Sequence, residues 1–295
     1  METPLARLTR FAPAPTGFLH LGHIVNAIYV WGWGRHVGAR VLLRIEDHDS
    51  QRSRTAFEDA LLEDLDWLGF DPDLFHTDDF RRGYCESRQS DRGAIYERVA
   101  RSLIESGQVY ACTCSRRDLT AIHASGLAGD GGRCRSAARA PADGTTWRLV
   151  CEDTVERFED VRHGVVEQRP FTQHGDVAIR DRHGNWTYQF AVVVDDHGQG
   201  IDLVIRGDDL LASTGLQIAL GRTIGRPEPA HFLHHPLAMQ SPGRKLSKSA
   251  GDTGIRDLRA RGWTASEVIG QAAHAGGLTP TPSPISASAV ANLFV

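Results

Sequence analysis

The feature that most constrains the fold is an N-terminal pattern of strand, turn, helix and strand. Residues 6–12 read as a short strand, and the turn that follows, 13–17, contains two prolines and a glycine. A largely apolar helix is predicted to begin within 20–23, and 41–46 is a continuous apolar run typical of a buried parallel strand. These segments form a βαβ unit, which predicts a parallel sheet covered by helices.

Two helices are predicted after this unit. Residues 55–70 place their apolar side chains on one helical face. Thr55 and Glu58 fit a capping box at its start, and Gly69 stands where a C-cap is expected. A second helix is predicted over 91–106. Both helices extend the α/β pattern.

The sequence changes in character over 108–175. Short strands, glycine-rich turns and cysteines occur there, and 122–144 reads as a loop, so the segment is interpreted as an insertion. Buried strands are then predicted over 188–195 and 201–206 because both runs are continuously apolar.

The last part of the chain is predicted to be mainly helical. One helix is expected over 214–224, and the tail, 255–295, is expected to hold one or two helices and then a proline-rich, irregular end. The chain is therefore predicted to be an α/β protein with a doubly wound parallel sheet. Its predicted units are a split catalytic domain, an inserted subdomain and a C-terminal helical segment: 1–107 with 176–250, 108–175, and 251–295.

Composition argues against a membrane or coat protein. Hydrophobic residues make up 41% and charged residues 24%, and no apolar run approaches the length of about 20 residues that spans a bilayer. Residues 1–11 lack the apolar core of a secretion signal, so a cytoplasmic location without a membrane partner is expected. The formal net charge of −4 argues against a general nucleic-acid coat and is compatible with a local basic patch.

Three of the five cysteines are grouped as Cys112, Cys114 and Cys134. An odd number of cysteines without a secretion signal argues against a disulfide framework. Three thiols in one segment suggest a structural zinc ion, which usually takes four ligands. The alternative is three reduced cysteines without a metal.

Two short motifs carry the chemistry of phosphate transfer. His20 and His23 stand at a predicted helix N-terminus, where free N–H groups attract phosphate, and Gly22 between them allows close approach of a nucleotide. The two lysines of the chain, Lys245 and Lys248, both fall in the run KLSKS after a Pro-Gly turn. Such a loop can close over a triphosphate and stabilise a leaving pyrophosphate.

Together the motifs resemble those of class I aminoacyl-tRNA synthetases, with HLGH at 20–23 and KLSKS at 245–249 flanking an α/β domain. RFAPAPTGFLHLGH, RIEDHD, VVVDDH and VIRGDDLL resemble blocks of the glutamyl and glutaminyl enzymes, in the family's order. The resemblance covers 7–112 and 185–250. It implies a Rossmann-like nucleotidyl-transferase fold with an inserted zinc-type subdomain.

The short stretch after KLSKS indicates which branch of this family the chain resembles. Full-length glutamyl enzymes continue into an anticodon-binding region, and none is expected within 250–295. The chain is therefore similar to the truncated glutamyl-Q tRNA(Asp) synthetases. That family activates L-glutamate with ATP in the absence of tRNA and esterifies it to queuosine in the wobble position of tRNA(Asp). The expected partners are L-glutamate and this tRNA, and a monomer is expected.

A site for glutamate needs one carboxylate and at least one arginine. Glu46 can pair with the substrate ammonium, Arg10 and Arg206 can bind carboxylates, and Tyr188 can donate a hydroxyl hydrogen bond. Strand ends are where doubly wound sheets bind ligands. The resemblance implies that the following residues form this site: Arg10, Phe11, Ala12, Pro13, Ala14, Glu46, Tyr188 and Arg206. The family often has serine at the position of Ala14, which leaves only a backbone role there.

The resemblance also implies an ATP site and a metal set. ATP-binding residues would be His20, Gly22, His23, Asp208 and Lys248, with His20, His23, Lys245 and Lys248 catalytic and Mg²⁺ offsetting phosphate charge. A relative has a tyrosine zinc ligand four residues before the last cysteine, and that position is Asp130 here. Tyr110, His123 or water are the alternatives for this fourth zinc ligand.

Three rival functions share these features. A short glutamyl-tRNA synthetase that charges a 3′ end would use the same active site. A nucleotidyltransferase outside the synthetases would share only the histidine motif. A non-catalytic tRNA-binding paralogue would be expected to lose one of the two motifs, and both are present.

Overall fold

The computed structural model describes residues 7–241, 244–245 and 254–294. The N-terminal βαβ unit is confirmed: β1 (Leu8–Phe11) pairs in parallel with β2 (Arg40–Leu43), and α1 (Leu21–His36) connects them. The helix is buried along most of its length, as an apolar crossover on a parallel sheet should be.

The helices after this unit lie close to their predicted ranges. They are α2 (Thr55–Leu68), α3 (Thr77–Arg81), the short 3-10 helix η1 (Gln89–Arg92) and α4 (Gly93–Glu105). Gly69 caps α2 with a φ of 78°, as predicted. The capping box is wrong, because the N-cap of α2 is Arg54 and Glu58 instead accepts a hydrogen bond from Arg88 at 2.7 Å.

A second sheet has the strand order β6-β5-β9-β8, formed by β5 (Glu156–Asp160), β6 (Gly164–Gln168), β8 (Leu203–Gly207) and β9 (His231–His235). β8 and β5 both run parallel to β9, and β6 is antiparallel to β5. β8 lies next to β1, where the carboxylate of Asp202 accepts the backbone N–H of Leu8 at 2.8 Å. The predicted α/β class with parallel strands is confirmed.

The insertion is built on a three-stranded antiparallel sheet of β3 (Val109–Cys112), β4 (Thr146–Leu149) and β7 (Val177–Arg180). Its helices are α5 (Arg116–Ala124), α6 (Arg133–Ala137) and α7 (Pro170–His174), so the predicted loop over 122–144 contains a helix. Strand pairing departs from the predicted boundaries. β7 completes the insertion's sheet beyond residue 175, whereas β5 and β6 join β9.

The prediction of a strand over 188–195 is wrong. This segment forms α8 (Tyr188–Gly198), which begins after the extended residue Thr187 and is buried from Phe190 to Asp196. A continuous apolar run fits a fully buried helix as well as a buried strand, so its pattern could not distinguish the two. The 3-10 helix η2 (Asp208–Ser213) and α9 (Thr214–Thr223) follow β8, and α9 matches its prediction.

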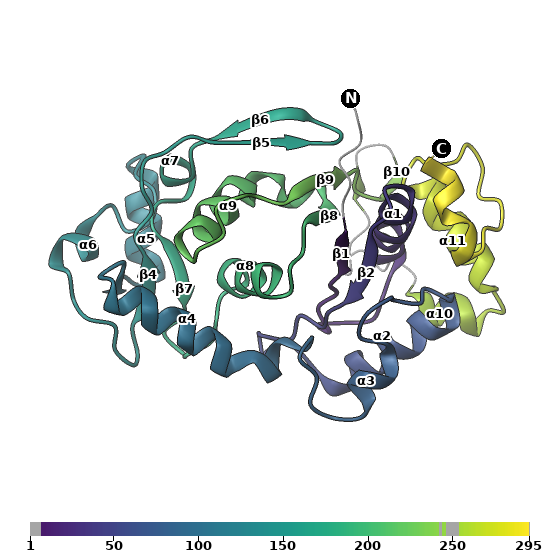
Figure 1. Ribbon diagram of the computed structural model, residues 1–295, viewed down its shortest axis with the longest axis horizontal. Coiled ribbons are helices and arrows are strands. Elements are labelled where there is room, and N and C mark those ends of the chain that lie inside the picture. Colours follow the sequence, from purple (N-terminus) through teal and green to yellow (C-terminus); the bar gives the residue numbers. More distant parts are fainter. Residues whose placement is uncertain (1–6, 242–243, 246–253, 295) are drawn as a thin grey trace.

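The C-terminal part packs on the first helix (Figure 1). The hairpin of β10 (Met239–Ser241) and β11 (Arg244–Lys245) precedes α10 (Ile255–Ala260) and α11 (Ala265–Ala275). The predicted irregular end contains instead a 3-10 helix, η4 (Ala287–Phe294), whose Phe294 ring lies 5.2 Å from that of Tyr29. An added Cβ at Gly32 would overlap Phe294, so this glycine permits the close approach of η4 to α1.

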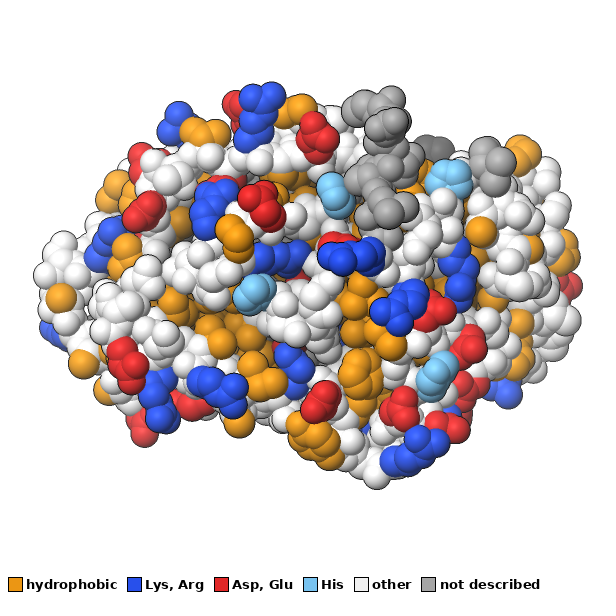
Figure 2. All heavy atoms as spheres, in the orientation of Figure 1, with side chains coloured by type: hydrophobic (Ala, Val, Ile, Leu, Met, Phe, Trp, Pro, Cys, Tyr) orange, Lys and Arg blue, Asp and Glu red, His pale blue; other side chains and the backbone are white. Residues whose placement is uncertain are grey.

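Figure 1 shows the insertion at one end of the molecule and the C-terminal helices at the other, with β1, β8 and α8 between them. In Figure 2 basic and acidic side chains are interspersed on this face, and several basic ones lie near its centre. Within the described residues, no helix is both long and apolar enough to cross a membrane.

Candidate active site

The histidine motif stands at the N-terminus of α1. His20 is the N-cap, and its Nδ1 accepts the backbone N–H of Gly22 at 3.1 Å. The backbone N–H of His20 donates in turn to Nδ1 of His23 at 3.1 Å, and the ring centroids lie 4.0 Å apart. Because both Nδ1 atoms accept, each neutral ring carries its proton on Nε2, where it is a donor. A Cβ at Gly22 would come within 3.0 Å of the His20 ring, which accounts for the glycine.

The described residues on either side of 246–253 are Lys245 of the lysine motif and Gly254, and Gly254 lies beside the start of α1. Lys245 lies in β11, and Lys248 lies outside the described residues. After the motif, the described chain resumes at Gly254, which forms an antiparallel bridge with His20. The described chain after the lysine motif therefore begins beside the backbone of the histidine motif.

Two of the buried arginines near the predicted glutamate site share a single carboxylate. Asp196 Oδ1 lies 3.0 Å from Nε of Arg10 and 2.8 Å from an amino nitrogen of Arg44. Although burial opposes it, the positive charges of Arg10 and Arg44 lower the pKa of Asp196 to about 2. Arg44 also donates to Glu46 at 3.0 Å. Asp196 thus compensates Arg10, and Arg44 orients Glu46.

Glu46 lies beside the segment that leaves β1. Its backbone N–H donates to the carbonyl of Pro13 at 3.0 Å, which joins the two predicted parts of the glutamate site. Burial raises the pKa of Glu46, and the neighbouring Arg44 and Arg10 oppose that rise. Phe11, by contrast, is a core residue whose ring packs 5.2 Å from Trp31, and half-buried Ala12 and Ala14 lie on either side of buried Pro13.

Arg206 has a different set of partners. Its Nε donates to Nε2 of His234 at 2.9 Å, and its amino groups donate to Gln217 at 2.5 Å and to Thr214 at 2.8 Å. The side chain is buried, and burial lowers its pKa. No carboxylate among the described residues forms an ion pair with it. A buried cation without an anionic partner is costly, so this position suits a substrate carboxylate.

Tyr188 shows that the predicted residues converge. Burial and the nearby charge of Glu46 raise the pKa of the Tyr188 hydroxyl, whereas Arg206 and Arg10 oppose the rise. These electrostatic effects place the charges of Glu46, Arg206 and Arg10 near the Tyr188 hydroxyl. Arg10 belongs to β1, Tyr188 to α8 and Arg206 to β8. Glu46 lies three residues after the end of β2.

Asp208 is held by the turn between β5 and β6. Arg162 lies 2.5 Å from Oδ2 of Asp208, and Nε2 of His163 lies 2.8 Å from its Oδ1. Neither partner of Asp208 was predicted, because both lie within 108–175, the segment assigned to the insertion, about 45 residues before Asp208 in the chain.

The three thiols of Cys112, Cys114 and Cys134 lie within 4.8 Å of one another and are buried. Burial and hydrogen bonds among these sulfurs raise the pKa of Cys114 to about 12. This cluster has the soft donors that zinc prefers.

Asp130, the predicted fourth ligand, is not among the three residues whose ligand atoms lie within 4.8 Å of one another. Its two oxygens accept the backbone N–H groups of Gly132 and Cys134 at 3.0 and 2.9 Å. Tyr110 donates its hydroxyl to Asp176, and Nε2 of His123 lies 3.1 Å from a backbone carbonyl. The carboxylate of Asp130 thus orients the turn that presents the last cysteine.

Sequence reasoning missed four residues that hold the site together: Asp196, Arg44, His234 and Gln217. Arg44 lies in the block RIEDHD and Asp196 in VVVDDH. A charged residue next to an apolar run could have indicated that both are buried and paired. His234 and Gln217 had no such signal. Their role depends on contact with Arg206 across the fold.

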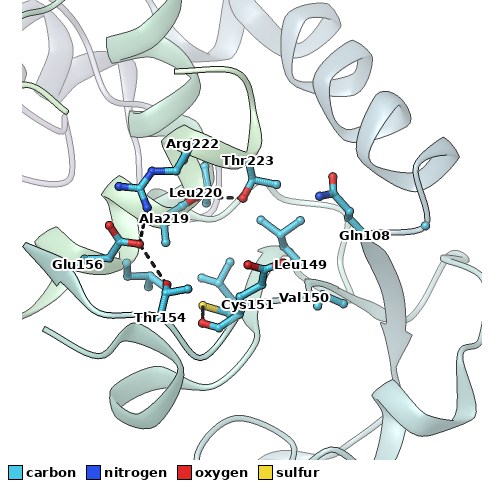
Figure 3. Close-up of a pocket in the computed structure, with 14 residues that line it drawn as sticks. Gln108, Leu149, Val150, Cys151, Thr154, Glu156, Ala219, Leu220, Arg222 and Thr223 are labelled. Atoms are coloured by element: carbon cyan, nitrogen blue, oxygen red, sulfur yellow. Dashed lines mark hydrogen bonds and ion pairs between the residues drawn. The ribbon is translucent and has the colours of Figure 1, made fainter. Parts of the chain in front are cut away.

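A cavity of about 300 Å³ lies between the insertion and α9 (Figure 3). The residues that line it include Leu149, Cys151, Leu216 and the ion pair of Glu156 with Arg222, and none of the predicted site residues is among them. The site built from Arg10, Glu46, Tyr188 and Arg206 is therefore separate from this cavity.

Solved structures share the whole fold. A glutamate tRNA ligase from Elizabethkingia meningosepticum aligns with a TM-score of 0.77 and 26% identity, covering 98% of this chain and 64% of the ligase. A glutamate-tRNA synthetase from Elizabethkingia anophelis aligns with a TM-score of 0.78 and 26% identity, covering 97% of this chain and 65% of its own.

The sequence relatives have a higher identity to this chain than these two solved structures have. A protein of Symbiobacterium thermophilum named glutamyl-Q tRNA(Asp) synthetase is 39% identical over 94% of this chain and 88% of its own length. The glutamate–tRNA ligase 2 of Syntrophus aciditrophicus is 37% identical over 86% of this chain, which spans 54% of that ligase. Residues 7–276 match the model of the class I tRNA synthetases (E and Q), catalytic domain. The chain therefore belongs to the class I tRNA synthetases of the E and Q type.

Proposed function

We propose that this chain activates L-glutamate with ATP in the absence of tRNA and transfers the glutamyl group to queuosine in the wobble position of tRNA(Asp). The observation that supports glutamate as the substrate is the environment of Arg206. This buried cation has no carboxylate partner among the described residues and lies near Glu46 and Tyr188. This arrangement is complementary to a substrate with one ammonium group and two carboxylates.

The first step forms glutamyl-adenylate. An oxygen of the glutamate α-carboxylate attacks the α-phosphorus of ATP, and the bond to the leaving pyrophosphate breaks. His20 and His23 donate from Nε2 to phosphate oxygens at the N-terminus of α1, and Lys245 and Lys248 stabilise the pyrophosphate. Mg²⁺ would supply further charge neutralisation when bound with ATP. A hydroxyl of the acceptor then attacks the mixed anhydride and releases AMP.

The acceptor is proposed from the relatives. Several that are named glutamyl-Q tRNA(Asp) synthetase are 39 to 42% identical to this chain, among them one of Pseudomonas aeruginosa that is matched over 76% of its length. Relatives named glutamate–tRNA ligase 2, at 37 to 38% identity, support the rival function of charging a tRNA 3′ end. Transfer to queuosine and transfer to a tRNA 3′ end would use the same active-site chemistry.

One experiment separates the two acceptors. We expect labelled glutamate to be transferred to tRNA(Asp) that contains queuosine, also when its 3′ terminus is a dideoxyadenosine, and not to tRNA(Asp) that lacks queuosine. ATP–pyrophosphate exchange should require glutamate and proceed without tRNA. Transfer that persists without queuosine and is lost with the blocked 3′ end would contradict the proposal and favour the rival.

A further inference from the structure

Behind Arg206 lies a second buried pair, Asp160 and His234. Asp160 ends β5 and His234 lies in β9, the strand that pairs with β8. Oδ2 of Asp160 lies 2.7 Å from Nδ1 of His234 and accepts the backbone N–H of His234 at 3.0 Å. Both side chains are fully buried, so solvent does not compete for these bonds.

The surroundings fix the tautomer of His234. Although burial opposes it, hydrogen bonds from His234 and from two backbone N–H groups lower the pKa of Asp160, which is therefore an ionised acceptor. Its partner Nδ1 must then carry the proton. Burial lowers the pKa of His234, and the charge of Arg206 contributes to the same effect, so Nε2 keeps its lone pair. That lone pair accepts the Nε–H of Arg206 at 2.9 Å, and the hydroxyl oxygen of Thr214 lies 3.1 Å from the same Nε2.

This order of groups has a consequence for charge. A carboxylate placed directly against Arg206 would orient the guanidinium and also neutralise it. The neutral imidazole of His234 orients the guanidinium and leaves its charge available to a ligand. Thr214, Gln217 and Tyr188 also hydrogen-bond to this guanidinium, and their side chains are neutral too.

We propose that His234, oriented by Asp160, is a positioning residue that fixes Arg206 for a substrate carboxylate without compensating its charge. The inference rests on the proposed function, because it takes Arg206 as the group that binds glutamate. His234 does not touch the reacting atoms, so its effect should appear in the KM for glutamate and not in kcat.

The same carboxylate also holds the turn that binds Asp208. Oδ1 of Asp160 accepts the backbone N–H groups of Arg162 and His163 at 2.9 and 3.0 Å. These two residues form the ion pairs with Asp208. A substitution of Asp160 would therefore disturb two regions at once, and His234 is the better position for a test.

Two variants divide the contacts of His234. In His234→Asn the amide can reach the position of Nδ1 and donate to Asp160, and Nε2, which contacts both Arg206 and Thr214, is lost. In His234→Gln the amide oxygen can reach the position of Nε2 and accept from Arg206, and the donor to Asp160 is lost. Both variants keep the backbone N–H bond to Asp160.

The measurement is ATP–pyrophosphate exchange with glutamate and ATP varied in turn. We expect His234→Asn to raise the KM for glutamate about 10- to 100-fold, since a hydrogen bond to a charged group is lost, with the KM for ATP and kcat within about threefold. His234→Gln should raise it less than His234→Asn does. An unchanged glutamate KM in His234→Asn, or a larger rise in His234→Gln, would overturn the positioning role.

Two further measurements keep the inference testable. Nitrogen NMR of the unsubstituted protein should show His234 neutral with its proton on Nδ1, and a protonated ring or the other tautomer would overturn the proposal even if both variants fail to fold. Arg206→Ala serves as the reference. If it leaves glutamate KM unchanged, the proposed glutamate site fails; if it raises KM and His234→Asn does not, only the positioning role fails.

Discussion

At the scale of single residues, the buried arginines differ by the charge of their partners. Arg10 and Arg44 share the carboxylate of Asp196, whereas Arg206 contacts only neutral groups among the described residues. The first two are compensated within the fold, and the third is available to an anionic ligand. Residue type and position alone predicted Arg10 and Arg206 as equivalent, and only their partners separate them.

Asp196→Asn should therefore destabilise the protein. The change removes one charge from between two buried guanidinium groups, and breaking a buried ion pair in this way costs roughly 3–5 kcal/mol. Urea unfolding monitored by circular dichroism measures the loss. The matched control is Asp153→Asn, since Asp153 is exposed and its contact with Arg169 is 3.9 Å long. The control should change stability by less than about 1 kcal/mol, and an equal loss in both variants would contradict the argument.

At the scale of elements, the accuracy of sequence prediction depended on how local the signal was. The helix over 55–70 and its glycine cap were predicted because amphipathic spacing and a C-cap are local patterns. The segment 188–195 was assigned to the wrong class because burial on every side removes that spacing. η4 was not predicted because the prolines just before it, at 280, 282 and 284, indicated an irregular end.

The contact of α2 with the C-terminal helices contains a buried carboxylate, Asp64. Its two oxygens have no hydrogen-bond partner among the described residues. Burial raises its pKa to about 6, against the opposing charges of Arg256 and Arg259 in α10. A charged carboxylate here weakens this contact, so protonation should stabilise it.

Stability should accordingly depend on pH through Asp64. Because its folded pKa lies above its unfolded value of 3.8, the folded state binds the proton more tightly, and stability falls as pH rises from about 4 to about 6. Asp64→Asn should raise the free energy of unfolding at pH 7.5 by about 2–3 kcal/mol and have a smaller effect at pH 5. Urea unfolding at both values tests this.

The control for that experiment is Asp59→Asn on the same helix. Asp59 is exposed, so its substitution should leave the difference between pH 5 and pH 7.5 unchanged. A gain from Asp64→Asn that is the same at both pH values would show that the ionisation of Asp64 is not its cause.

At the scale of the whole molecule, the proposed glutamate site and the cysteine cluster belong to different parts of the fold. The cluster lies in the insertion, on β3, α6 and the chain between β3 and α5. The proposed glutamate site lies around β1, β8 and α8, in the middle of the view in Figure 1. A metal at the cluster would therefore stabilise the insertion and take no direct part in glutamate activation.

Metal analysis should find one zinc ion per chain, and Cys112→Ser should abolish it. Structural zinc contributes directly to folding, so the variant should show a lower Tm, by about 2–4 °C for each kcal/mol lost. Glutamate-dependent ATP–pyrophosphate exchange at 25 °C should stay within about threefold. Cys85→Ser, at a buried cysteine outside the cluster, is the control for removing a thiol. Equal zinc content in Cys112→Ser and in the unsubstituted protein would contradict the assignment.

The sequence by itself determined the N-terminal βαβ unit, the order of the histidine and lysine motifs, and the grouping of the cysteines. These follow from residue type and spacing along the chain, which are local properties. Tertiary structure decided that 188–195 is a helix, that β5 pairs with β9, and that Arg206 contacts His234. Each of these depends on which segments, far apart in the chain, pack against one another and bury their surfaces. Hydrogen bonds between such distant residues leave no periodic pattern in the sequence.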